Sequence, residues 1–152
     1  WGGGMQIALG CDFRLFKPDA SLSIMEGKWG LIPDMGGTLA LRELVSRDRA
    51  MWFAMSAREF SAREAFDSGL ATDLSEDPHG AAMEMARQLG ERSPDAIAAV
   101  KRLYRKSWPG SSGLALARET YYQLRIVSGA NQRVSVRRQL GEEVKFKRAR
   151  RW

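Results

Sequence analysis

Strand patterns are scarce in this chain of 152 residues, and this limits its fold more than any other feature. Residues 13–16 (FRLF) and 21–25 (SLSIM) are predicted to form short strands, and Pro18-Asp19 supplies the turn between them. Nearly everything after residue 38 has a helical pattern. Two short strands cannot make a stable sheet by themselves. We therefore expect the remaining strands in an N-terminal half of the same protein, upstream of Trp1.

The helical segments carry recognisable start and stop signals. Ser61 and Glu64 have the spacing of a capping box, and Gly69 suits the position after the end of that helix. Ser93 followed by Pro94 marks another helix start. The helices are predicted at residues 5–10, 38–46, 48–56, 62–68, 80–91, 94–107, 114–128 and 131–149.

These patterns divide the chain into two parts of an α/β protein. Residues 1–75 are predicted to be a small α/β part with the candidate active-site loops, and residues 76–152 a helical part. Length, 44% hydrophobic and 28% charged residues are typical of a globular chain and exclude a collagen-like or disordered one. No apolar run approaches the ~18 residues of a membrane helix.

One cysteine and one histidine exclude several kinds of site. Cys11 cannot form an internal disulfide, which favours a reducing, cytoplasmic location. A zinc site built from His and Cys needs more ligands than the chain has, so we expect no metal. His79 is predicted to lie in a surface loop at residues 77–80, and no G-x-S-x-G motif supplies a nucleophile for it.

The positive charge is concentrated at the C-terminal end. Residues 101–152 carry 14 Lys and Arg against three Asp and Glu, whereas residues 1–100 carry 10 against 15. Such a basic segment suits a phosphate-bearing ligand, a nucleic acid or an acidic neighbouring subunit. A solvated helix face is the alternative interpretation.

Two acids, Glu26 and Asp34, flank the loop Gly30-Leu31-Ile32-Pro33. Two carboxylates in different surroundings can serve as proton donor and proton acceptor. The structural alternatives are a salt bridge at a strand end for Glu26 and a helix N-cap or turn for Asp34. The run Gly2-Gly3-Gly4 is either a tight turn or a helix start whose N–H groups face a developing oxyanion.

Several motifs together resemble those of the crotonase superfamily, the enoyl-CoA hydratases and isomerases. Residues 2–12 (GGGMQIALGCD) are similar to its G-G-G-x-[E/D]-L-x-x-x-C-D stretch, and residues 26–37 (EGKWGLIPDMGG) to its P-E-x-x-x-G-x-x-P-x-x-G-G loop. Residues 60–70 (FSAREAFDSGL) resemble its A-x-E-A-x-x-x-G-L-V segment, and residues 147–152 (KRARRW) its closing E-K-R-x-P-x-F. The order and spacing correspond to the C-terminal half of a typical member.

The resemblance implies a crotonase-like spiral of ββα units followed by a helical trimerisation region, in trimers or hexamers. It implies an acyl-CoA thioester as substrate, with no further cofactor. By position, the backbone N–H of Gly3 supplies one of the two oxyanion donors, and the other belongs to the N-terminal half. We therefore expect this half alone to be inactive.

The resemblance also predicts the reaction. Hydratases of the family use two glutamates; Gln6 stands at the first of those positions and Glu26 at the second. Glu26 and Asp34 together resemble the acid pair of dienoyl-CoA isomerases, with Asp34 as base at C2 and Glu26 as acid near C6, or with Glu26 as sole acid/base in a simpler double-bond shift. Isomerisation is therefore preferred to hydration.

Lys145, Lys147, Arg148 and Arg150 are the candidates for contacts with the CoA phosphates. Two other functions stay open. One is a family member that binds acyl-CoA or a partner without turnover, which the uncharged Gln6 supports. The other is binding of RNA by the basic tail, which is the less favoured choice.

Overall fold

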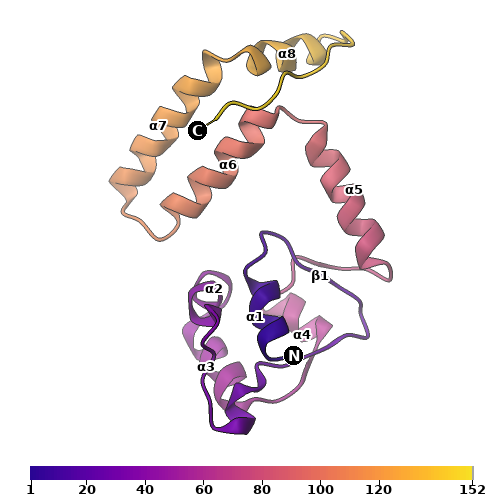
Figure 1. Cartoon of the computed structure of the whole chain (residues 1–152), viewed down its shortest axis with the longest axis vertical. Coiled ribbons are helices and arrows are strands. Elements are labelled where there is room, and N and C mark those ends of the chain that lie inside the picture. Colours follow the sequence, from indigo (N-terminus) through magenta and orange to yellow (C-terminus); the bar gives the residue numbers. More distant parts are fainter. Residues whose placement is uncertain (152) are drawn as a thin grey trace. The chain divides into compact units, whose positions relative to one another are not determined.

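The computed structural model describes residues 1–151, and Trp152, the last residue of the basic motif, lies outside the described residues. The chain divides into two compact units, Trp1–Met83 and Glu84 to the C-terminus (Figure 1). The predicted division lies between residues 75 and 76, whereas the boundary between the two units along the chain falls within helix α5 (Pro78–Gly90).

The first unit combines short helices with four two-residue strands. Its elements are α1 (Gly3–Leu9), β1 (Leu15–Phe16), β2 (Ser21–Leu22), the 3-10 helix η1 (Met25–Trp29), α2 (Gly37–Leu44), α3 (Arg47–Ser56), β3 (Phe60–Ser61), α4 (Ala62–Asp67) and β4 (Asp73–Leu74).

The two predicted strands do not pair with each other. β1 pairs in parallel with β4, and β2 pairs antiparallel with β3. Both partners were missed because two residues are too few to give an alternating pattern. The predicted strand at 21–25 is also too long, since residues 25–29 form η1 and carry Glu26 on a helical turn.

The core of the first unit lies among its helices. Phe53 of α3 and Phe60 of β3 stack with ring centroids 4.2 Å apart. Met5 and Leu9 lie one turn apart on α1 and are both buried, so this face of α1 is fixed against the core. The position of the next residue, Gln6, is set by the same packing.

The start of α4 is capped differently from the predicted capping box. Ser61 Oγ accepts from Glu64 N at 3.1 Å, as expected. The Glu64 carboxylate instead binds the Arg58 guanidinium, which lowers the pKa of that carboxyl. In a full capping box the Glu64 carboxylate would accept from the backbone N–H of Ser61; here its partner is the Arg58 guanidinium. Gly69 follows the helix with φ 88°, as its sequence position predicted.

His79 is exposed, as predicted, but it is not in a loop. Pro78 opens α5, and Asp77 Oδ1 accepts from Gly80 N at 2.9 Å. The segment that looked like a turn is an aspartate cap with proline at the first helical position.

The second unit is helical and contains α6 (Pro94–Ser107), α7 (Ser112–Val127) and α8 (Ala130–Gln139). Ser93 caps α6 as predicted, accepting from Ala96 N at 3.4 Å. α6 and α7 pack side by side (Figure 1). The apolar side chains of α6 are only partly covered, because Val100 and Tyr104 are exposed while Ala99 is buried.

The C-terminal helix is shorter than predicted. α8 ends at Gln139, and residues 142–151 have no regular structure. Gly141 has φ 90°, which stops the helix. The tail is held instead by Asn131, whose Oδ1 accepts from Lys147 N at 2.8 Å and whose Nδ2 donates to Lys147 O at 3.0 Å.

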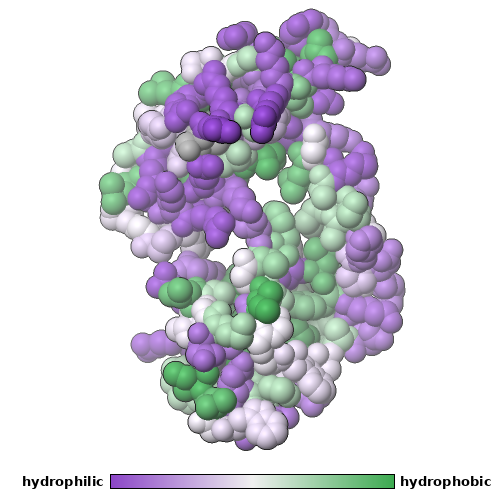
Figure 2. Space-filling model, viewed as in Figure 1, coloured by the Kyte–Doolittle hydropathy of each residue, from purple (hydrophilic) through white to green (hydrophobic). Residues whose placement is uncertain are grey.

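No helix within residues 1–151 has both the length and the apolar character needed to traverse a bilayer. In the view of Figure 2, hydrophilic side chains gather over the part that Figure 1 identifies as α7, α8 and the tail. This agrees with the concentration of Lys and Arg in residues 101–152.

Candidate active site

The amide of Gln6 joins three segments of the first unit. Its Nε2 donates to Glu26 Oε1 at 2.7 Å. Its Oε1 accepts from Met35 N at 2.9 Å and from Gly37 N at 3.1 Å. The side chain is 3% exposed. Both lone pairs of the amide oxygen are therefore occupied by backbone donors, and the amide nitrogen is directed at the carboxylate.

Two glycines make room for this arrangement. A Cβ on Gly37 would stand 2.8 Å from Gln6 Oε1, so only glycine lets the N–H approach that oxygen. Gly2, with φ 56°, turns the chain into α1 and donates its N–H to Ser23 O at 3.0 Å. Gly37 thus lies against Gln6, and Gly2 lies near Glu26, the partner of Gln6.

Glu26 lies on η1 and is partly buried. Its Oε1 is bonded to Gln6, and its Oε2 is buried with no hydrogen-bond partner among residues 1–151. The salt bridge considered as its structural alternative is absent from the described part of the chain. A buried oxygen without a partner costs about 1–3 kcal/mol, so such an atom requires an explanation such as a ligand or a reaction.

Asp34 is exposed and stands two residues before Gly36, the N-cap of α2. It is therefore not the helix cap that was considered as its structural alternative. The residue after it, Met35, gives its N–H to Gln6 Oε1. The structure thus brings the backbone beside Asp34 to the same amide that holds Glu26.

Gly3 is the first residue of α1, where a backbone N–H has no acceptor within the helix. A Cβ on its neighbour Gly2 would lie 3.8 Å from Glu26 Oε1. A Cβ on Gly3 itself would lie 3.0 Å from Met35 Sδ, so Gly3 lies against the residue that follows Asp34. A donor role for its N–H stays a prediction.

An apolar cavity of about 600 Å³ begins beside these residues. Gly27, directly after Glu26, and Pro33, directly before Asp34, are both part of its wall. Its other lining residues come from the loop and from α2 and α3: Leu31, Ile32, Thr38, Leu41, Arg42, Val45, Arg47, Ala50, Met51, Ala54 and Met55. The sequence motifs gave no indication of this cavity or of its two arginines, Arg42 and Arg47.

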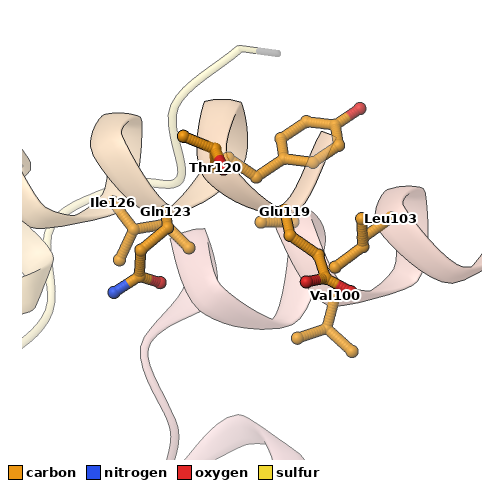
Figure 3. Close-up of a pocket in the computed structure, with 8 residues that line it drawn as sticks. Val100, Leu103, Glu119, Thr120, Gln123 and Ile126 are labelled. Carbon is orange, nitrogen blue, oxygen red and sulfur yellow. The ribbon is translucent and has the colours of Figure 1, made fainter. Parts of the chain in front are cut away.

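A second cavity, of about 430 Å³, lies between α6 and α7 of the other unit. Figure 3 shows Val100 and Leu103 on one helix facing Glu119 and Gln123 on the other. The predicted catalytic residues all belong to the first unit, and neither they nor their chain neighbours line this cavity.

The four basic tail residues are all exposed but differ in their contacts. The Arg150 guanidinium donates to Arg125 O at 3.0 Å and to Ser128 O at 3.3 Å, at the end of α7. Asn131 binds only the backbone of Lys147, and Lys147 is exposed. Lys145, Lys147 and Arg148 are thus better suited to an external phosphate than Arg150. No group of three or more His, Cys, Asp or Glu able to hold a metal occurs among the described residues.

Comparison with known proteins gives one consistent set of relatives. The family model described as "Enoyl-CoA hydratase/isomerase" matches residues 1–140. A carnitinyl-CoA dehydratase of Salmonella paratyphi A is 36% identical over 107 residues, which are 69% of this chain and 41% of that protein. The chain thus spans less than half the length of that relative.

Two solved structures resemble the chain closely. An enoyl-CoA hydratase from Polaromonas sp. JS666 is 28% identical, with a TM-score of 0.89 over 96% of this chain and 58% of that one. A putative enoyl-CoA hydratase from Thermobifida fusca YX in complex with acetoacetyl-CoA is 31% identical. Its TM-score is 0.79 over 84% of this chain and 51% of that one.

Proposed function

Because the chain belongs to the enoyl-CoA hydratase/isomerase family, we propose that it carries the acid–base part of an active site for acyl-CoA thioesters. Its fold is the α/β crotonase-like fold that the motifs predicted. The CoA complexes among its structural relatives support an acyl-CoA substrate.

The observation that carries the proposal is the buried Oε2 of Glu26, which has no partner within residues 1–151. A carboxylate oxygen in this state can exchange a proton with a carbon of the acyl chain. The N–H of Gly3 supplies one hydrogen bond to the enolate oxygen that develops. Asp34 is the second acid, on the other side of the loop that lines the apolar cavity.

A double-bond shift is the reaction we prefer. Hydration by two acids needs a proton acceptor at position 6, and an amide cannot accept a proton at neutral pH. The oxygen of Gln6 is also occupied by the N–H groups of Met35 and Gly37. Protons therefore pass through Glu26, with Asp34 as base at C2 in the dienoyl case.

Hydration or dehydration of an enoyl-CoA is the second candidate, favoured by the names of the relatives. In that case Glu26 alone activates or receives the water. Binding of acyl-CoA without turnover, or of RNA by the tail, is a weaker alternative.

We further propose that Lys145, Lys147 and Arg148 contact CoA phosphates and that the protein acts as a homotrimer or hexamer. The basic charge of residues 101–152 supports the phosphate contact. A cytoplasmic location agrees with the single cysteine, Cys11.

The test uses the full-length protein with a 2-enoyl-CoA and, separately, a 3,5-dienoyl-CoA, followed by ultraviolet absorbance. We expect a conjugated-dienoyl band to grow in the second mixture while the first stays unchanged. Loss of the enoyl-thioester band in the first would favour hydration. No change in either would overturn both catalytic candidates.

Asp34→Asn separates the two acids. We expect it to abolish dienoyl isomerisation and to leave CoA affinity unchanged, because Asp34 is exposed and caps no helix. Turnover and CoA binding by calorimetry are the two measurements. Unchanged turnover would remove Asp34 from the site.

A further inference from the structure

We propose that Gln6 is a positioning residue. By binding one oxygen of Glu26 it leaves the other to transfer protons, and it fixes the position of the backbone beside Asp34 relative to Glu26. The inference deepens the proposed function and rests on it. The chemistry needs an amide at position 6, because one side chain must both donate to a carboxylate and accept from two backbone N–H groups.

The donor half of the amide orients Glu26. Gln6 Nε2 holds Oε1 at 2.7 Å, so Oε2 is the carboxylate oxygen left for the substrate. With Oε1 bound, the carboxylate plane is restricted and the reactive oxygen is pre-organised. A freely rotating Glu26 would expose either oxygen and lose part of this advantage.

The acceptor half of the amide orients the loop. Gln6 Oε1 binds Met35 N at 2.9 Å and Gly37 N at 3.1 Å. Met35 directly follows Asp34, and Gly37 is the first residue of α2. A single side chain therefore links both candidate acids, although they lie on different segments.

The proton-transfer step balances without a co-reactant. Glu26 Oε2 accepts a proton from one carbon of the acyl chain, and the electrons of that C–H bond pass into the dienolate. In the single-acid shift, the same oxygen returns this proton to the other reacting carbon, so the double bond has moved and the carboxylate is restored. In the dienoyl case, Asp34 accepts the proton from C2 and a protonated Glu26 Oε2 donates one near C6. One proton has then moved from Glu26 to Asp34, and it returns through solvent, to which Asp34 is exposed, before the next turnover.

Neither close substitute keeps all three hydrogen bonds of the amide at neutral pH. Leucine has similar bulk but loses all three hydrogen bonds and leaves two backbone N–H groups without a partner. Glutamate keeps an acceptor for the N–H groups but places a second carboxylate beside Glu26 Oε1. Two carboxylates so close cannot both be ionised without strong repulsion, so the pair must share one proton.

The experiment compares pH profiles of kcat and KM for wild type, Gln6→Glu and Gln6→Leu in the full-length protein. In Gln6→Glu, the shared proton replaces the amide N–H at low pH, so kcat there stays within about threefold of wild type. As pH rises the proton is lost, and kcat falls about tenfold per pH unit, with KM little changed. Gln6→Leu is slow at every pH.

Gln88→Glu is the matched control. Gln88 Nε2 donates to Glu84 Oε1 at 2.8 Å in the same kind of contact, but both residues are exposed on α5. Its kcat profile should coincide with that of wild type. A parallel profile for Gln6→Glu and wild type, or full kcat in Gln6→Leu, would overturn the inference.

A charge-swap variant tests the contact without any substrate. The melting temperature of Gln6→Glu should fall as pH rises, relative to wild type, because the paired carboxylates repel. The double variant Gln6→Glu/Glu26→Gln restores an amide–carboxylate pair, so that pH dependence should disappear, while turnover falls as it does in Glu26→Gln alone. A melting temperature of Gln6→Glu that follows wild type at every pH contradicts the inference.

These readouts keep the two proposals apart. If wild type acts on neither thioester, the proposed function fails, and the melting temperatures still decide whether Gln6 controls Glu26. If wild type is active and the Gln6 variants behave as the control does, only the inference fails. If Gln6→Leu folds poorly, the pH profiles and melting temperatures of Gln6→Glu and of the double variant Gln6→Glu/Glu26→Gln still decide the inference.

Discussion

Two buried amide–carboxylate pairs, one in each unit, use the same chemistry for different ends. In the first unit, Gln6 Nε2 donates to Glu26 Oε1 at 2.7 Å; in the second, Asn131 Nδ2 donates to Asp95 Oδ2 at 3.1 Å. Both amides also accept backbone N–H groups from distant segments. Gln6 and Asn131 are each almost fully buried.

The difference lies in the second oxygen of each carboxylate. Asp95 Oδ1 accepts from Arg150 N at 2.7 Å, so both oxygens of Asp95 have partners. Glu26 Oε2 has none within residues 1–151. A satisfied buried network stabilises one arrangement of the chain, whereas an unsatisfied one holds a reactive atom at an energetic cost. We infer that the Asp95 pair secures the tail and that the Glu26 pair serves the reaction.

The largest expected effect is that of Glu26→Gln on turnover. Removing the proton carrier should lower kcat by about 10²–10⁴-fold. The fold should change little, because the new amide can still accept from Gln6. Steady-state kinetics and thermal unfolding measure the two effects. Full activity in this variant would show that the comparison assigns the wrong pair to catalysis.

Asn131→Leu should break the other pair and affect stability. It removes the partner of Asp95 Oδ2 and both contacts to the Lys147 backbone, so we expect a loss of about 2–4 kcal/mol in unfolding free energy. The tail at residues 142–151 should also become sensitive to protease. Denaturant unfolding and limited proteolysis test this. A variant as stable as wild type would mean that the hydrogen bonds of Asn131 are not needed to hold the tail.

Arg150→Ala and Arg148→Ala sharpen the separation within the tail. Arg150 binds two carbonyls at the end of α7, so its loss should cost about 1 kcal/mol of stability. Arg148 is exposed, and its loss should instead weaken CoA binding by up to about fivefold. Unfolding curves and CoA titrations should give opposite rankings for the two variants.

The smallest effect concerns a carboxylate held by arginine rather than by an amide. Arg58 lowers the pKa of Glu64, so this pair stabilises the fold above the unfolded pKa of about 4.3, and the gain is lost as pH falls. Glu64→Gln should cost about 0.5–1 kcal/mol at pH 7, since the pair is partly exposed. In urea unfolding, the difference in unfolding free energy between Glu64→Gln and wild type should disappear as the pH is lowered.

Local signals in the sequence predicted much of the fold. Helix starts at Ser61 and Ser93 and the stop at Gly69 were found, because a cap depends on a few neighbouring residues. Strand pairing was not, because β3 and β4 are two residues long and derive their partners from distant segments. The end of α8 was misplaced by ten residues, since charged residues continue past Gln139, whereas Gly141 with φ 90° ends the helix.

The site shows the same division. The sequence itself singled out Glu26 and Asp34, and the resemblance of the motifs to the family added Gly3 and Gln6, because such motifs lie within short stretches of chain. Spacing could not indicate that one amide joins Glu26 to the backbone of Met35 and Gly37, since these residues lie 20 to 31 positions from Gln6 in the sequence. Only packing of α1 against the core determines where that amide points. Which carboxylate oxygen stays unpaired is therefore a property of the tertiary structure, where burial removes the water that would otherwise satisfy both oxygens.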